Sequence, residues 1–78
     1  MPKTRQITTS KIEATPEELI LFVSGKQVRI PWEKCSSKLA AATVEQRVNA
    51  QLSPGGYGIH WPMLDEDLSI NGLLREAS

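Results

Sequence analysis

One short segment gathers the residue types that most often carry chemistry. His60 is the single histidine, and Asp65, Glu66 and Asp67 follow it closely. An imidazole and carboxylates can bind a metal ion, or act as a general base with an acid that orients it. If residues 59–61 form a strand, His60 points away from the face that holds its two neighbours. We favour a structural role for the acids, which can shape a turn and cap the following helix.

Two tryptophans and one arginine are further candidates for contact. Trp32 and Trp61 each end a predicted strand beside a proline, and the first interpretation of both is core packing with the indole N–H near the surface. An exposed tryptophan would instead anchor a partner. Arg47 lies on a predicted helix, where it can pair with Asp65 or Glu66 across the fold or stay solvated.

The segment 55–58, Gly-Gly-Tyr-Gly, allows two interpretations. Backbone N–H groups of a glycine-rich loop can cradle a phosphate where the loop leads into a helix. A strand is expected after this segment, so glycine in a tight turn or bulge is the better explanation. Tyr57 is a candidate contact with a partner or ligand.

Cys35 is the only cysteine, which excludes a disulfide within the chain and a thiolate metal cluster. No histidine lies near it in sequence, so a buried small residue is favoured over a nucleophile. A reducing cytoplasm is the natural setting for this composition. The longest apolar run, residues 19–23, is too short for a signal peptide or a membrane span.

The size and charge of the chain favour one domain that contacts other protein surface. With 78 residues there is room for one hydrophobic core, and a second copy that covers apolar surface would stabilise it. Nine basic and nine acidic residues cancel, which argues against nucleic acid as a partner. Residues 1–50 carry eight Lys or Arg against five acids, and residues 51–78 carry one against four. This polarity suits head-to-tail contact between copies, although solvated surface charge is the simpler explanation.

The N-terminal half predicts a hairpin. Residues 1–6 are polar and basic and are expected to form a flexible arm, and residues 7–14 are a weak strand candidate. Residues 15–18, Thr-Pro-Glu-Glu, fit either a helix start or a type I turn. The apolar run 19–23, a Ser-Gly-Lys turn and the alternating pattern of residues 27–32 indicate two paired strands.

Two short helices are expected next. Residues 39–42, Leu-Ala-Ala-Ala, favour a helix from about residue 34. Thr43 and Gln46 have the spacing of a capping box, which begins a second helix. That helix is expected to carry an apolar stripe of Val44, Val48 and Leu52. The two helices should meet at an angle and cover one face of the sheet.

The C-terminal third predicts a strand, a loop and a short helix. Residues 57–62 form an extended segment closed by proline, and residues 64–67 are typical of a loop. Ser69 can then cap a last turn or two of helix, whose apolar face holds Ile70, Leu73 and Leu74. The elements define an α+β fold: a small antiparallel sheet, made of a hairpin plus one or two further strands, with two or three short helices on one face. Residues 7–78 are expected to form this single domain.

Several of these segments together resemble a known family. Over roughly residues 18–75 the chain resembles the bacterial domain-of-unknown-function family 2442. The resemblance rests on the segments 30–32 (IPW), 39–43 (LAAAT), 45–47 (EQR), 55–62 (GGYGIHWP), 64–70 (LDEDLSI) and 72–74 (GLL). The stretch 58–69 is long and unusual enough to be specific.

The resemblance implies a compact α+β fold in bacteria or their mobile elements, with no established biochemical activity. Some similar proteins carry a fused helix-turn-helix domain, for which this chain has no room. Many are encoded beside a second small protein, in a pair proposed to act as toxin and antitoxin. The chain departs from the family pattern at Val44, where proline is expected, and at Ser37 and Lys38, where proline and arginine are common. These changes loosen the helix start.

We therefore expect a non-catalytic protein-interaction module, homo-oligomeric and antitoxin-like, that uses no cofactor and has itself or a small protein as partner. The alternative is a small enzyme or ligand-binding domain that uses His60 and the acidic segment, which requires a pocket of about 300 Å³ or more joining them. The candidates for contact are Trp32, Arg47, Tyr57, His60, Trp61, Asp65, Glu66 and Asp67.

Overall fold

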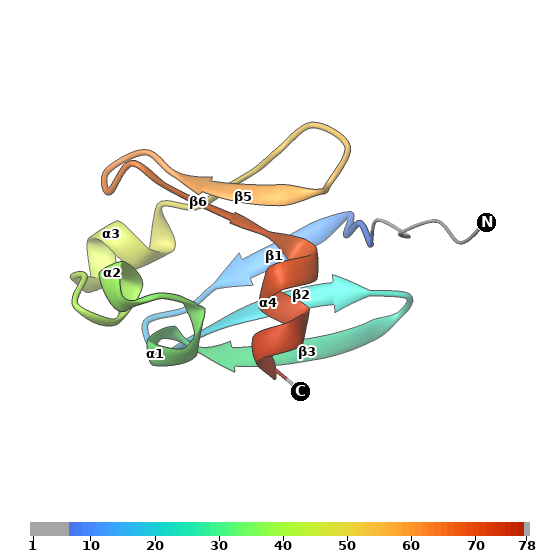
Figure 1. Ribbon diagram of the computed structural model, residues 1–78, viewed down its shortest axis with the longest axis horizontal. Coiled ribbons are helices and arrows are strands. Elements are labelled where there is room, and N and C mark those ends of the chain that lie inside the picture. Colours follow the sequence, from blue (N-terminus) through green and yellow to red (C-terminus); the bar gives the residue numbers. More distant parts are fainter. Residues whose placement is uncertain (1–6, 78) are drawn as a thin grey trace.

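The computed structural model describes residues 7–77 and confirms an α+β fold (Figure 1). Two small antiparallel sheets are combined with four short helices. In chain order the elements are β1 (Lys11–Ala14), β2 (Glu18–Val23), β3 (Lys26–Pro31), α1 (Trp32–Cys35), α2 (Ser37–Ala40), α3 (Val44–Val48), β4 (Gln51–Leu52), β5 (Gly58–Trp61), β6 (Glu66–Ser69) and α4 (Ile70–Ala77). The arm predicted for residues 1–6 lies outside the described residues. None of the described helices has the length and apolar character needed to cross a membrane.

The first sheet, β1-β2-β3, contains the predicted hairpin. Its two-residue turn, Ser24 and Gly25, has φ angles of 52° and 77°, and positive φ at both positions matches the twist of the flanking strands. β2 begins at Glu18, so residues 15–18 form a turn rather than a helix start. The N–H of Glu18 donates to the Thr15 hydroxyl (3.0 Å), which fixes this turn.

The sequence patterns predict one sheet, and the structure contains a second, β4-β5-β6. The predicted strand is confirmed as β5. The loop predicted for residues 64–67 is wrong in its second half, because Glu66 and Asp67 begin β6. Asp65, with a φ of 52°, completes the reversal after β5, and Glu66 then lies opposite Trp61 in the antiparallel register. The sequence did not indicate this strand because Glu66 and Asp67 are of residue types that are uncommon in strands.

Gly56 fixes the turn between β4 and β5 against the segment that precedes β1. Gly55 and Gly56 have φ angles of 86° and 75°, which supports a turn rather than a phosphate cradle. A Cβ at Gly56 would lie 2.2 Å from the Thr9 carbonyl oxygen. The Thr9 N–H also donates to the Gly56 carbonyl (3.0 Å), so this close backbone crossing requires glycine.

The helices before β4 divide where the sequence provides caps. The single helix expected from about residue 34 is two short ones, α1 and α2. Ser36 is extended between them, and its hydroxyl accepts from the N–H of Leu39 to cap α2. The capping box of Thr43 and Gln46 is confirmed at the start of α3.

The predicted apolar helix face is wrong for α3 and right for α4. α3 ends at Val48, both of its valines are exposed, and Leu52 belongs to β4. The stripe fails because it needs a helix that continues through residues 49–52. At α4 the N–H of Gly72 donates to the Ser69 hydroxyl (3.0 Å), as expected for a cap. The buried face of α4 holds Ile70 and Leu73, with Leu74 packed at its margin.

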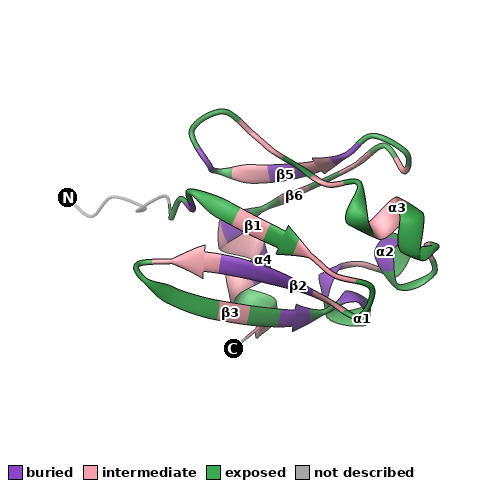
Figure 2. Ribbon diagram, turned by 180° about the vertical axis from the view of Figure 1, so that it is seen from behind, coloured by how far each residue is buried: buried purple, intermediate pink, exposed green. Residues whose placement is uncertain are grey.

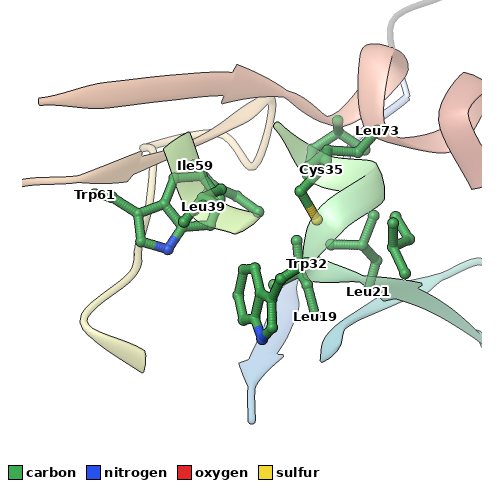
Figure 3. Close-up of a cluster of buried hydrophobic side chains, with 10 residues drawn as sticks. Leu19, Leu21, Trp32, Cys35, Leu39, Ile59, Trp61 and Leu73 are labelled. Carbon is green, nitrogen blue, oxygen red and sulfur yellow. The ribbon is translucent and has the colours of Figure 1, made fainter. Parts of the chain in front are cut away.

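The hydrophobic core lies where the sheets and helices meet. α4 crosses one face of the first sheet, and α1 to α3 gather at one end, as the opposite views in Figures 1 and 2 show. In the close-up of Figure 3, side chains from both sheets point toward those of α1 and α2. The buried cluster consists of Leu19, Leu21, Ile30, Trp32, Cys35, Leu39, Ile59, Trp61, Ile70 and Leu73. One continuous core therefore holds both sheets together.

Candidate interaction site

His60 and Asp67 face each other on the outer surface of the second sheet. Ile59 and Trp61 are buried, and His60 points the other way, as predicted. The β5–β6 register places His60 opposite Asp67, with Nδ1 2.8 Å from Oδ1. The two side chains remain 39% and 76% exposed, so this pair contributes little to stability.

Beside this pair the surface forms a hollow of about 350 Å³. Its lining includes the exposed Tyr57, but Asp65 and Glu66 do not reach it. The structure therefore joins His60 with one of the three predicted acids. Within residues 7–77, no group of three His, Cys, Asp or Glu side chains is placed to hold a metal ion. The hollow offers an imidazole and a carboxylate that are open to solvent.

The three acids occupy different positions, and none of them caps the last helix. Asp65 forms the turn after β5, which confirms its turn-shaping role. The capping predicted for Asp65 and Asp67 is wrong, because the chain stays extended through Ser69 and that hydroxyl takes the capping position. Glu66 is a strand residue of intermediate exposure.

Trp32 and Trp61 are core residues, which confirms the core packing predicted for both. They are 1% and 0% exposed, so neither presents an indole to a partner. The rings meet edge to face, with centroids 6.1 Å apart and an angle of 83° between planes. The Trp32 indole N–H donates to the Thr15 carbonyl (2.9 Å), and that of Trp61 donates to the Arg47 carbonyl (3.0 Å). Both polar atoms are therefore satisfied inside the fold.

Arg47 connects three backbone segments, and both roles predicted for it are wrong. It does not pair with Asp65 or Glu66, and it is not simply solvated. Its guanidinium donates instead to three carbonyl oxygens, those of Leu39 (2.9 Å), Ala40 (2.8 Å) and Pro16 (3.1 Å). Leu39 and Ala40 end α2, where carbonyls lack partners within the helix. The side chain also lies against the Trp32 ring, 5.9 Å from its centroid.

Cys35 is buried, as the sequence suggests. Burial raises the pKa of its thiol from 9.0 to about 12, and the nearby charge of Arg47 opposes this shift only in part. The thiolate that a nucleophile requires is therefore scarce at neutral pH.

β6 forms an open edge of the second sheet. Within the described chain, β5 is the one strand that pairs with it. The N–H of Ile70 donates to the Tyr57 carbonyl (2.8 Å), one step beyond the pair Gly58 and Ser69. Because bonded and non-bonded pairs alternate in an antiparallel ladder, the N–H groups of Asp67 and Ser69 and the carbonyl of Asp67 point away from β5. Backbone groups that point outward from the edge strand of a sheet are the ones with which another extended chain can pair.

A groove of about 370 Å³ runs between this edge and α4. Leu68 and Leu73 contribute apolar surface to it, and the exposed acids Asp67 and Glu76 stand at its margins. The full lining is Cys35, Asp67, Leu68, Ser69, Gly72, Leu73 and Glu76, and it includes no Lys or Arg. The sequence interpretation missed Ser69 and Glu76 as exposed surface for contact, although their spacing places them on one face of the predicted last helix.

The fold and these surfaces define a small α+β protein with one shared core, an open acidic sheet edge and a solvent-exposed His–Asp pair. Residues 10–78 match the model of the family described as "Protein of unknown function (DUF2442)", and the chain belongs to this family. A protein of unknown function from Rhodospirillum rubrum ATCC 11170, known from a crystal structure, has a similar fold, with a TM-score of 0.78 and 26% sequence identity. The similarity covers 91% of this chain and 88% of that chain. No curated protein matches the chain.

Proposed function

We propose that the chain is a non-catalytic protein-interaction module that forms a homo-oligomer through the open edge of β6. The observation that carries this proposal is the outward orientation of the Asp67 and Ser69 N–H groups beside a groove. An extended segment can add to such an edge through main-chain hydrogen bonds and place alternate side chains in the adjoining groove.

The contacts of the conspicuous residues support a role without catalysis. Trp32, Trp61 and Arg47 are used inside the fold to join the sheets and helices. The raised pKa of Cys35 disfavours its thiolate. The small size of the chain also favours association, because covering the groove would remove apolar surface from water. The antitoxin-like role and a small partner protein stay predictions from the family resemblance.

Sedimentation velocity of the native protein over a range of concentrations tests the homo-oligomer. The sharpest variant is Asp67→Pro, which removes one outward N–H without removing a hydrogen bond of the β5–β6 ladder. Asp67→Asn is the matched control, because it changes the same side chain and keeps the N–H. We expect Asp67→Pro to weaken association at least tenfold and Asp67→Asn to weaken it less. Circular dichroism checks that both variants fold.

A second measurement needs no variant. Amide exchange of Asp67 and Ser69 should slow as the protein concentration rises, because association protects these two N–H groups. A monomer at all concentrations, with concentration-independent exchange, would contradict the proposal.

A ligand-binding or enzymatic role is the alternative, favoured by the His60–Asp67 pair beside a hollow of about 350 Å³. Thermal-shift screening against a set of common metabolites tests it. Asp67→Asn changes an acid in the hollow, and Asp65→Asn is a matched control outside it, at a position with a φ of 52° that asparagine tolerates. Ligand binding and cell phenotype that are unchanged in His60→Ala would exclude this alternative.

A further inference from the structure

We infer that the strand that pairs with the open edge of β6 is β3 of a second copy of this chain. The inference rests on the proposed function and names the partner segment. Within residues 7–77, β2 is the one strand that pairs with β3, so β3 lies at an edge of the first sheet as β6 does of the second. β3 is the outer strand of its sheet in both views (Figures 1 and 2).

β3 has its own row of outward backbone groups. Val23 and Lys26 flank the two-residue turn of the hairpin, so they form a hydrogen-bonded pair. Because bonded and non-bonded pairs alternate in an antiparallel ladder, the N–H and carbonyl groups of Gln27 and Arg29 point away from β2. The nitrogen of Pro31 has the same outward orientation, which is where an edge strand accepts proline. β3 therefore has outward donors and acceptors like those of β6.

The charges of the two strands favour pairing of β3 with β6 over pairing of either strand with itself. β6 carries Glu66 and Asp67 and no basic residue, whereas β3 carries Lys26 and Arg29 and no acid. Two β6 strands side by side would bring carboxylates together, and two β3 strands would bring cations together. Like charges on neighbouring strands are destabilising, and opposite charges are stabilising. Charge therefore selects one strand of each kind.

One antiparallel register satisfies the outward groups of both edges. It places Asp67 opposite Arg29 of the second copy, so that each N–H donates to the carbonyl of the other. Two residues further along, the Ser69 N–H meets the carbonyl of Gln27. Together these bonds use the outward N–H groups of Asp67 and Ser69 and the outward carbonyl of Asp67.

The same register matches the side chains on both faces. Leu68 lies opposite Val28, and both residues already pack against the margin of the core in their own copy. On the other face Asp67 lies opposite Arg29, and these side chains are 76% and 58% exposed. Arg29 also bonds Glu18, but a guanidinium has several N–H donors and can bond a second carboxylate. A pair this exposed contributes little affinity and acts mainly on the choice of partner and register.

Proline at each edge in turn tests the inference in the full chain. Arg29→Pro removes an outward N–H of β3, and Asp67→Pro removes one of β6, and neither removes a hydrogen bond of the sheets within a copy. We expect each variant alone to associate at least tenfold more weakly than the native protein in sedimentation velocity. Arg29→Gln, which keeps the N–H, is the matched control for Arg29→Pro and should weaken association less. Circular dichroism checks that the variants fold.

A mixture of the two proline variants is the most specific experiment. The contact is heterologous, so each copy supplies β3 to one neighbour and β6 to another. In the mixture, β3 of the Asp67→Pro chain still fits the β6 edge of the Arg29→Pro chain, and the opposite contact is blocked. We expect a heterodimer of one copy of each variant that grows no further.

Exchange of the two charges tests the register without proline. Asp67→Arg and Arg29→Asp should each weaken association several-fold, and the double variant should recover most of the loss because the cross-strand pair is restored. The control combines Glu45→Arg with Lys34→Asp, which makes the same charge changes at exposed positions on α3 and α1. A double variant as weak as the single variants would overturn the register.

The outcomes separate the inference from the proposed function. Native-like association of Arg29→Pro, together with its loss in Asp67→Pro, would overturn the assignment of β3 and leave the edge of β6 as the interface. A mixture of the two proline variants that stays monomeric would also overturn the pairing of β3 with β6. A native protein that is monomeric at every concentration would overturn both proposals.

Discussion

Trp61 and Arg47 are linked through the core side of the fold: the indole N–H of Trp61 donates to the Arg47 carbonyl at 3.0 Å. The guanidinium of the same arginine donates to three further carbonyls, on α2 and on the loop between β1 and β2. Arg47 thus connects the second sheet, through Trp61, to the first sheet and to α2. A residue that resembles a surface charge in the sequence is a structural connector.

Arg47→Lys should destabilise the protein by about 1–3 kcal/mol, because a lysine ammonium cannot reach three separately oriented carbonyls. Urea denaturation measures the change in the free energy of unfolding. Arg75→Lys, on the exposed side of α4, is the control and should be near neutral. Equal effects of the two substitutions would show that the three hydrogen bonds contribute nothing measurable.

Trp61→Ala should cost about 3–5 kcal/mol, since it leaves a cavity beside Trp32 and removes the hydrogen bond to Arg47. For a domain of this size that loss is close to the whole stability, so circular dichroism should show a largely unfolded chain at 37 °C. Tyr57→Ala removes an exposed aromatic side chain and should leave the fold intact. A Trp61→Ala variant with a native-like unfolding midpoint would contradict this account of the core.

Gly56→Ala and Gly25→Ala separate backbone strain from steric clash. Both glycines have φ near 76°, at 75° and 77°, but a Cβ at Gly25 meets nothing within 4 Å. A Cβ at Gly56 would overlap the Thr9 carbonyl oxygen. We expect Gly25→Ala to cost about 1–2 kcal/mol from strain alone, and Gly56→Ala to cost about 1–3 kcal/mol more. An equal loss of stability in the two variants, measured by thermal unfolding, would mean that the backbone at Thr9 moves to accommodate the added methyl group at no cost.

Cys35 should make the fold sensitive to alkaline pH. Burial raises the pKa of its thiol from 9.0 to about 12, so between these values the folded protein holds a proton that the unfolded chain has released. The stabilising contribution is complete below about pH 9 and is lost as the pH rises toward 12. The unfolding free energy should therefore fall more steeply across this range in the native protein than in Cys35→Ala. Parallel pH profiles of the two proteins would contradict the assignment.

The local elements of this fold could be predicted from the sequence, because each depends on residues close together in the chain. Ser24 and Gly25 specify the hairpin turn, Thr43 and Gln46 specify the start of α3, and Ser69 specifies that of α4. The outward position of His60 follows from strand alternation alone. Burial of the two tryptophans likewise follows from their apolar area.

Tertiary structure alone decided which segments meet. Glu66 and Asp67 carry no local preference for a strand, and they become one because pairing with β5 satisfies their backbone. The carbonyl partners of Arg47 and the lining of the groove between β6 and α4 come from several segments of the chain. The shared core brings these segments together. The sequence therefore determined the positions of the turns and helix caps in this protein. Long-range packing determined which sheet edge stays open, because no local sequence pattern encodes the strand order that leaves β6 at the edge of its sheet.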